Sequence, residues 1–207
     1  MARYIGRDNL RRRLEPYQGA PGRTTYQSGS VTIELPEETL TVRPAFGLRH
    51  ESSYETVELG PLFEALAEDH VVAALMVRLG GFAVGVFEGE RLVASKVGSR
   101  FVKGRHKKGG SSANRFRRRR EKQVRELIEA AAATAVDVLG PWRDRVEFAA
   151  LGGDRRAIDD VLEADLRLQW LAERALPRFF TTGDPRFRDL ERLPYDLYSA
   201  ETTEGAV

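Results

Sequence analysis

The sequence has no cysteine, few histidines and no long apolar run. Without cysteine there is no disulfide framework, thiolate nucleophile or thiolate metal site, so a reducing cytoplasm is the expected location. The three histidines, His50, His70 and His106, lack the spacing of a zinc site, and we expect neither a metal nor another cofactor. Charges such as Arg78 and Glu88 interrupt every stretch that approaches the roughly 18 apolar residues of a membrane span, so no membrane contact is expected. The charged N-terminus has no apolar stretch behind it, which predicts no secretory signal.

At 207 residues the chain is long enough for one domain with an appendage or for two small domains. Its charge is unevenly distributed. Residues 100–125, here called the basic segment, contain twelve Lys or Arg against one acid, Glu121, a net charge of +11. The whole chain carries only +2, so the other 181 residues carry −9. A cationic segment on an acidic protein is typical of a polyanion site, because Lys and Arg that neutralise phosphates release condensed counterions.

Residues 1–60 predict an N-terminal extension with a short helix and a β-hairpin. The helix is expected over 8–17 and carries Arg11, Arg12 and Arg13, which fit either a solvated helix face or a second RNA contact. A Gly/Pro/Ser-rich connector is expected before residue 30. Alternating apolar and polar residues over 31–36 and 38–46 predict the hairpin, and 48–56 reads as a polar loop.

Residues 61–195 predict the main domain, which begins with a short helix near Pro61. Three strands joined by short Gly-containing turns follow at 71–79, 81–89 and 91–99, as expected of an antiparallel meander. The first strand is almost wholly apolar, which predicts a central position with both faces buried. The remaining expected elements are a long helix at 114–139, a buried strand at 145–153, a helix from about Ala157, a short strand at 178–182, a helix at 185–193 and a polar C-terminal tail at 196–207. This order predicts a mixed α/β, α+β-like fold.

A tip of small residues, Gly109 to Asn114, lies inside the basic segment. Glycine has no Cβ, so its backbone N–H groups can approach a substrate at contact distance. The phosphate-binding P-loop does not match, because it needs Gly-x-x-x-x-Gly-Lys-Ser/Thr and here the lysines precede the glycines. A tip of this kind between cationic flanks suits insertion into a narrow RNA-lined cavity beside an ester bond.

The string Lys107-Lys108-Gly109-Gly110-Ser111-Ser112-Ala113, entered from a strand and followed by a basic helix, resembles the catalytic loop of the Vms-like release factor family, especially its actinobacterial branch. That family is related to the middle domain of eukaryotic and archaeal class-one release factors, which carry a Gly-Gly-Gln loop. The resemblance covers about residues 70–185. It implies an RNase H-like mixed sheet and a peptidyl-tRNA hydrolase that acts on stalled or split ribosomes, in ribosome rescue and quality control. The implied partners are peptidyl-tRNA and the rRNA of the large ribosomal subunit, with the protein monomeric off the ribosome.

One departure from the family concerns the glutamine that follows the glycines and helps to position the attacking water. Here Ser111, Ser112, Ala113 and Asn114 occupy that place, and the nearest glutamine is Gln123, inside the predicted helix. The role of the glutamine therefore cannot be transferred to this chain. The candidate catalytic residues are Gly109, Gly110, Ser111, Ser112 and Asn114.

Two ways of holding the water remain open. Either Ser112 or Asn114 orients it, or backbone N–H groups of Gly110 and Ser111 do so with help from the terminal ribose hydroxyl of the tRNA. Ser112 is disfavoured as a covalent nucleophile, because no base is positioned beside it by the sequence. His106 is the only nearby titrating group that could transfer a proton, and it also fits a simple RNA contact.

The candidate RNA-binding residues flank the tip on both sides: Lys103, Arg105, His106, Lys107, Lys108, Arg115, Arg117, Arg118, Arg119, Arg120 and Lys122. The four consecutive arginines point around a helix, so some of them must be solvated. Phe116 fits either stacking on a base or packing at the helix start. A nuclease is disfavoured, because the expected central strand has no acid for two-metal phosphodiester cleavage. A non-catalytic tRNA- or ribosome-binding module remains the alternative to the hydrolase.

Overall fold

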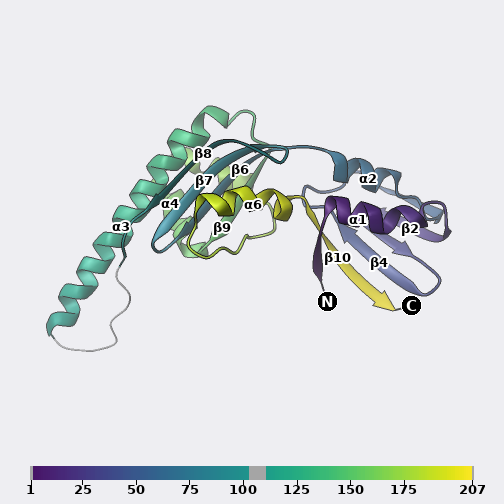
Figure 1. Cartoon of the computed structure of the whole chain (residues 1–207), viewed down its shortest axis with the longest axis horizontal. Helices are drawn as coiled ribbons and strands as arrows, with labels where there is room; N and C mark the ends of the chain where they lie inside the picture. The colour runs from purple at the N-terminus through teal and green to yellow at the C-terminus, as the bar shows by residue number, and fades with distance from the viewer. Residues whose placement is uncertain (1, 103–110, 207) are drawn as a thin grey trace. The chain divides into compact units, whose positions relative to one another are not determined.

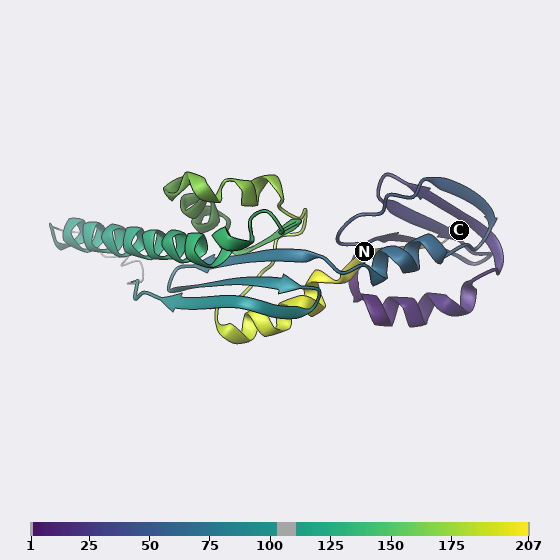
Figure 2. The same cartoon turned by 90° about the horizontal axis from the view of Figure 1, so that it is seen from above.

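The structure is a computed structural model that describes residues 2–102 and 111–206. The chain forms two compact units, and Figures 1 and 2 show the elements of each. Unit 1 comprises Met1–Asp69 and Leu193–Val207, and unit 2 comprises His70–Arg192. Unit 1 is therefore built from both ends of the chain.

Unit 1 is an antiparallel six-stranded sheet in the order β1-β10-β4-β3-β2-β5. Its strands are β1 (Arg3–Gly6), β2 (Pro21–Gln27), β3 (Ser30–Glu34), β4 (Glu38–Arg43), β5 (Ser52–Thr56) and β10 (Ser199–Ala206), and its helices are α1 (Arg7–Leu14) and α2 (Gly60–Ala67). Period-two alternation builds the core: Val31 and Ile33 of β3 are buried, whereas Thr32 between them is not. The buried side chains of the sheet pack with Leu10 of α1 and Leu62 of α2.

The structure confirms the predicted N-terminal helix and the hairpin, which is formed by β3 and β4. Three other predictions for this part of the chain were wrong. The expected connector contains β2, the expected polar loop contains β5, and the expected tail at 196–207 contains β10, which pairs with both β1 and β4. These strands bury few apolar side chains, such as Tyr26 and Ala200, because one face of the sheet carries polar residues. Their apolar pattern is therefore too weak to reveal them.

Unit 2 is a four-stranded sheet in the order β8-β7-β6-β9. Its elements are β6 (Val71–Arg78), β7 (Gly81–Glu88), β8 (Arg91–Ser99), α3 (Ser111–Leu139), β9 (Phe148–Gly153), α4 (Arg155–Ala164), α5 (Trp170–Glu173) and α6 (Phe187–Leu197), whose last turn belongs to unit 1. Strands β6, β7 and β8 form the predicted antiparallel meander, and β9 pairs parallel to β6. Strand β6 lies between β7 and β9 with Val72 to Val77 buried, so its predicted central position is confirmed.

Helices cover both faces of this sheet. Helices α3 and α4 pack on one face through a cluster that includes Leu127, Ala131 and Ile158, and Figure 2 shows α6 on the opposite side. On that side a Cβ at Gly85 would lie 3.3 Å from a methyl carbon of Leu190, so the small residue lets α6 approach. The fold is mixed α/β, as predicted. The strand expected at 178–182 is reduced to an isolated bridge between Gly152 and Phe180.

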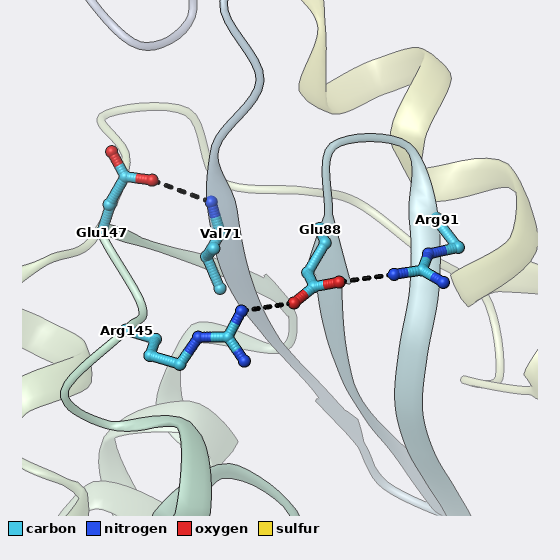
Figure 3. A network of polar contacts seen from close by, with 5 residues as sticks. All are labelled: Val71, Glu88, Arg91, Arg145 and Glu147. Atoms are coloured by element: carbon cyan, nitrogen blue, oxygen red, sulfur yellow. Dashed lines mark hydrogen bonds and ion pairs between the residues drawn. The ribbon is translucent and has the colours of Figure 1, made fainter.

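Polar contacts tie the strand ends of unit 2 together at the end where β6 begins (Figure 3). Glu88, at the end of β7, accepts hydrogen bonds from Arg91 of β8 at 2.6 Å and from Arg145 at 2.5 Å. These two hydrogen bonds hold the pKa of Glu88 below its usual value, and the bond from Arg91 has the larger effect. Nearby, Glu147 accepts the backbone N–H of Val71 at 3.0 Å. The connection from α3 to β9 is thereby fastened to the meander.

The position of β10 gives a test of unit 1. Glu201 is paired with Tyr4 of β1 on one side and with Arg43 of β4 on the other. We expect Glu201→Pro to lower the free energy of unfolding by at least about 1–3 kcal/mol, because it removes a ladder N–H and leaves an acceptor unpaired. Glu201→Ala keeps the backbone and should cost much less. Urea unfolding followed by circular dichroism measures both variants, and equal midpoints would contradict the pairing of β10 between β1 and β4.

The Glu88 contacts predict a titration. The Glu88 carboxyl should titrate at a lower pH than free glutamate, and Arg145→Ala should raise its pKa towards the ordinary value. Because the folded-state pKa is depressed, the contribution to stability is present above the unfolded-state pKa and is lost as the pH falls through the folded-state pKa. Carboxyl chemical shifts followed by NMR give both values. An unchanged pKa in Arg145→Ala would show that this arginine does not act on Glu88.

Candidate nucleic-acid interface

Helix α3 has 29 residues and is therefore about 43 Å long. This length exceeds the length of helix that covers the sheet of unit 2. Its C-terminal half is anchored: Leu127, Ile128, Ala131, Ala135 and Leu139 are buried against the sheet. Its N-terminal end is not, because every residue from Asn114 to Arg119 is exposed. Figure 1 shows this end of α3 running past the strands of unit 2. Exposure at six consecutive positions means that no side of the helix is covered there.

The structure begins α3 at Ser111, three residues before the predicted start. Ser111, Ser112 and Asn114 therefore belong to the first turn of a helix and not to a loop. Serine is common at helix starts, where a hydroxyl oxygen can accept hydrogen bonds from backbone N–H groups that have no partner within the helix. In the helix interior the same hydroxyl competes with the backbone hydrogen bonds. The other candidate catalytic residues, Gly109 and Gly110, lie outside the described residues. So do five candidate RNA-binding residues: Lys103, Arg105, His106, Lys107 and Lys108.

The six other candidate RNA-binding residues all lie on α3 but fall on two sides of it. Successive helical residues are about 100° apart. Arg115, Arg118 and Lys122 consequently lie opposite the buried residues of α3, with Arg119 beside them, and all four are exposed. We call these four residues the outer stripe. Arg117 and Arg120 instead continue the line of the buried face.

Ion pairs do not neutralise the outer stripe. Arg117 lies 3.8 Å from Glu121, and Lys122 lies 3.7 Å from Glu126. Both distances are near the limit for an ion pair and the four side chains are more than half exposed, so each pair contributes little to stability. Glu121 is the one acid between Ser111 and Arg125, and it lies on the side of Arg117. From Arg115 to Arg119 the outer stripe is therefore a surface of one charge sign, and Glu126 borders it at Lys122.

The opposite side of the same helix faces a groove of about 590 Å³ between α3 and α4. Arg120 lines it together with the apolar side chains of Leu79, Val124 and Ile128. Acids from both helices, including Glu121 and Asp160, offset its arginines, so the groove lacks the charge of a polyanion site. Asp154 at its end accepts the backbone N–H of Ala157 and caps α4. Within residues 2–102 and 111–206, no three potential metal-binding side chains gather at one place.

The arginines of α1 have partners inside unit 1. Arg13 forms an ion pair of 2.9 Å with Glu204 of β10, and the Arg11 guanidinium lies 5.3 Å from the centre of the Phe63 ring. Arg12 donates to Asn9 at 2.5 Å. Arg11 and Arg13 thus contact other elements of unit 1, and Arg12 is bonded within its own helix, which supports the helix-face alternative over a second RNA contact.

The two units also differ in net charge. The residues of unit 1 include 8 Arg and no Lys against 14 Asp or Glu, so this unit is acidic. The positive excess of the chain lies entirely in unit 2.

The sequence contains a signal that separates the inward arginines of α3 from the outer stripe. This signal is the periodic spacing of Val124, Leu127 and Ile128, extended towards the N-terminus of the helix.

Comparison with known proteins identifies the class. A segment of 121 residues, 58% of the chain, is 26% identical to peptide chain release factor subunit 1 of Archaeoglobus fulgidus and spans 30% of that factor. The solved archaeal termination factor aRF1 shares 15% identity at a TM-score of 0.46, over 78% of this chain and 49% of that one. Dom34 of S. cerevisiae, a translation termination-like factor involved in RNA quality control, shares 10% identity at a TM-score of 0.31, over 93% and 63%. The chain thus spans less than two thirds of each of these relatives.

By its sequence the chain is a release-factor-like protein, related to translation termination and ribosome rescue factors. Residues 70–203 match the sequence model of the actinobacteria/chloroflexi VLRF1 release factors, and the chain belongs to this family. The predicted resemblance is thereby confirmed. The match begins at the first residue of unit 2 and extends into β10. No helix in the described part of the chain is long and apolar enough to cross a membrane.

The two sides of α3 predict unequal effects of removing arginines. Arg115→Ala/Arg118→Ala and Arg117→Ala/Arg120→Ala each remove two positive charges from the same helix. We expect the first double variant to bind RNA with much lower affinity, because only its residues belong to the outer stripe. Its slope of log K against log salt should fall by about 0.7–0.9 for each phosphate that the variant no longer neutralises. Fluorescence anisotropy with labelled tRNA measures both quantities, and equal reductions in the two variants would contradict the two-sided arrangement.

Proposed function

We propose that this protein is a peptidyl-tRNA hydrolase that cleaves the ester between nascent peptide and tRNA on stalled or split ribosomes. The observation that carries this proposal is membership of a release factor family combined with an uncovered basic helix end directly after Gly109-Gly110. An α-helix is about 10–12 Å across, so an uncovered helix end can enter spaces that a packed domain cannot. The substrate, the large ribosomal subunit as partner, and a cytoplasmic place of action are part of the proposal.

The start of α3 offers a chemical reason for hydrolysis. The first four N–H groups of a helix, here those of Ser111 to Asn114, cannot be bonded within the helix, and the helix dipole places partial positive charge there. When water attacks the ester carbonyl carbon, negative charge develops on the carbonyl oxygen. Backbone donors at a helix start can stabilise that charge. The tetrahedral species then collapses, the terminal ribose oxygen of the tRNA leaves with a proton, and the peptide is released as an acid.

This chemistry favours the backbone alternative for the candidate site. The glycines bring main-chain groups close to the ester, and the helix start adds aligned donors from Ser111 and Ser112. No metal is required by this route, because the ester is already activated towards water. Catalysis by backbone groups also accounts for the absence of the family glutamine, whose place is taken by Ser111 to Asn114. An RNase H-like relationship of the sheet, implied by the family, stays a prediction.

A non-catalytic tRNA- or ribosome-binding module is the second candidate. The missing glutamine favours it, because the outer stripe alone would suffice for binding RNA phosphates. The two candidates differ in whether peptide is released.

Release of labelled peptide from peptidyl-tRNA on a large ribosomal subunit tests the proposal. We expect Gly110→Ala to reduce the release rate by about 100-fold or more, the usual cost of disturbing an oxyanion site, with binding retained. Gly140→Ala is the matched control: it lies at the other end of α3, where a Cβ would meet nothing within 4 Å, and it should release peptide like the wild type. Equal release by the wild type and Gly110→Ala would leave only the binding module.

Side-chain variants separate the two ways of holding the water. If backbone groups do the work, Ser112→Ala and Asn114→Ala should each change the release rate by less than about 10-fold, well below the cost of losing an oxyanion donor. A reduction in either variant as large as that in Gly110→Ala would assign the water to that side chain.

A further inference from the structure

The exposed end of α3 is a helix without the support that helices in proteins normally have. Residues 114–122, here called the basic end, include no buried residue, and even Phe116 is 41% exposed. Most helical stability in proteins comes from packing one face, and isolated helices shorter than about 12–15 residues are marginal in water. Packing against the core begins at the partly buried Val124, and the first fully buried residues are Leu127 and Ile128. The stability of the basic end therefore depends mainly on its own local interactions.

The like charges of the basic end oppose helix formation. Arg115 has like charges three and four residues on, at Arg118 and Arg119, and Arg118 has Lys122 four residues on. Like charges at these spacings destabilise a helix. The positive charges also lie near the positive end of the helix dipole, and the first turn has no acid to offset them.

The two ion pairs near the basic end do not offset this repulsion between like charges. In Arg117–Glu121 and Lys122–Glu126 the base precedes the acid, which is the weaker orientation on a helix. Each pair is also widely spaced and exposed. The basic end thus has like-charge repulsion along its length, positive side chains at the positive end of the helix dipole, and no buried residue.

We propose that the basic end of α3 is a conditional helix, completed when RNA phosphates neutralise the outer stripe, so that RNA binding and helix formation are one coupled step. This inference rests on the proposed function only for the identity of the polyanion. A row of phosphates offsets all three defects together: it screens Arg115 from Arg118, places negative charge at the helix start and packs against the exposed side. In the absence of RNA the basic end frays, and the helical form in Figure 1 is the one that RNA selects.

The arrangement favours a phosphate chain over single anions. Arg115 and Lys122 are seven residues apart and hence about 10.5 Å apart along the helix, with Arg118 between them. A continuous strand can contact all three residues at once, whereas each separate small anion loses its own translational entropy on binding. The consequence for function is a safeguard, because the start of α3 would be rigid only where RNA surrounds it.

Amide hydrogen exchange of the full chain, read by mass spectrometry at low salt, tests the proposal. Amides of residues 115–122 should exchange at least about 10-fold more slowly when tRNA or a large-subunit rRNA fragment is added to saturation. Residues 127–139 of the same helix are the internal control and should be protected throughout. The tRNA and rRNA arms show which RNA acts, and an inorganic polyphosphate arm measures how much of the effect is phosphate charge alone.

A pair of variants separates helix formation from RNA binding. Arg115→Glu/Arg118→Glu places acids four residues before Arg119 and Lys122, the favourable orientation, and near the positive end of the dipole. We expect it to protect residues 115–122 without RNA and to abolish the response to RNA. Arg115→Lys/Arg118→Lys keeps the charges and should behave like the wild type. All these side chains are exposed, so the thermal midpoint should not change.

Two results would overturn the conditional helix: wild-type residues 115–122 as protected without RNA as residues 127–139, or no gain of protection in Arg115→Glu/Arg118→Glu. The proposed function fails separately. RNA-dependent protection without peptide release would remove the hydrolase and keep the conditional helix, whereas peptide release with protection independent of RNA would do the reverse.

Discussion

The packing of the apolar face of α3 on the sheet of unit 2 is the interaction on which the rest of the site depends. Leu127, Ala131, Ala135 and Leu139 hold the C-terminal half of the helix, and the small alanines bring it close to β7 and β8. When α3 is helical along its whole length, fixing one half also sets the direction of the other, because an α-helix is stiff and continuous. Strand β8 leads into the basic segment, and α3 begins inside it at Ser111 and continues beyond its last residue, so both ends of the segment are joined to elements of unit 2.

Arginine has opposite roles in helices α1 and α3. In unit 1 each arginine of α1 has a partner of its own, as Arg13 has in Glu204, and the unit as a whole is acidic. In unit 2 the outer stripe of α3 has no acid on its side between Asn114 and Lys122. Local repulsion there weakens the helix but also makes the surface attractive to phosphate. A protein that kept this helix fully stable by adding acids would lose the same charge that binds RNA.

Sequence reasoning succeeded where one strong pattern dominated. The apolar run of β6, the Gly-containing turns of the meander and the repeat of Val124, Leu127 and Ile128 predicted unit 2 and its long helix. The Gly-Gly-Ser string with its cationic flanks led to the release factor family, which the match over residues 70–203 confirms. It failed for β2, β5 and β10, whose polar side chains read as connector, loop and tail.

The sequence by itself determined the positive charge of residues 100–125, the glycines at its centre and the apolar stripe of the helix that follows, because these depend on residue type and local spacing alone. Only the tertiary structure decided that the C-terminus completes the sheet of unit 1, since strand pairing joins residues at opposite ends of the chain, such as Arg3 and Thr202. It also decided which arginines turn away from the protein. Long-range packing sets the point along α3 at which the sheet ends. That point separates the buried half of the helix from the basic end.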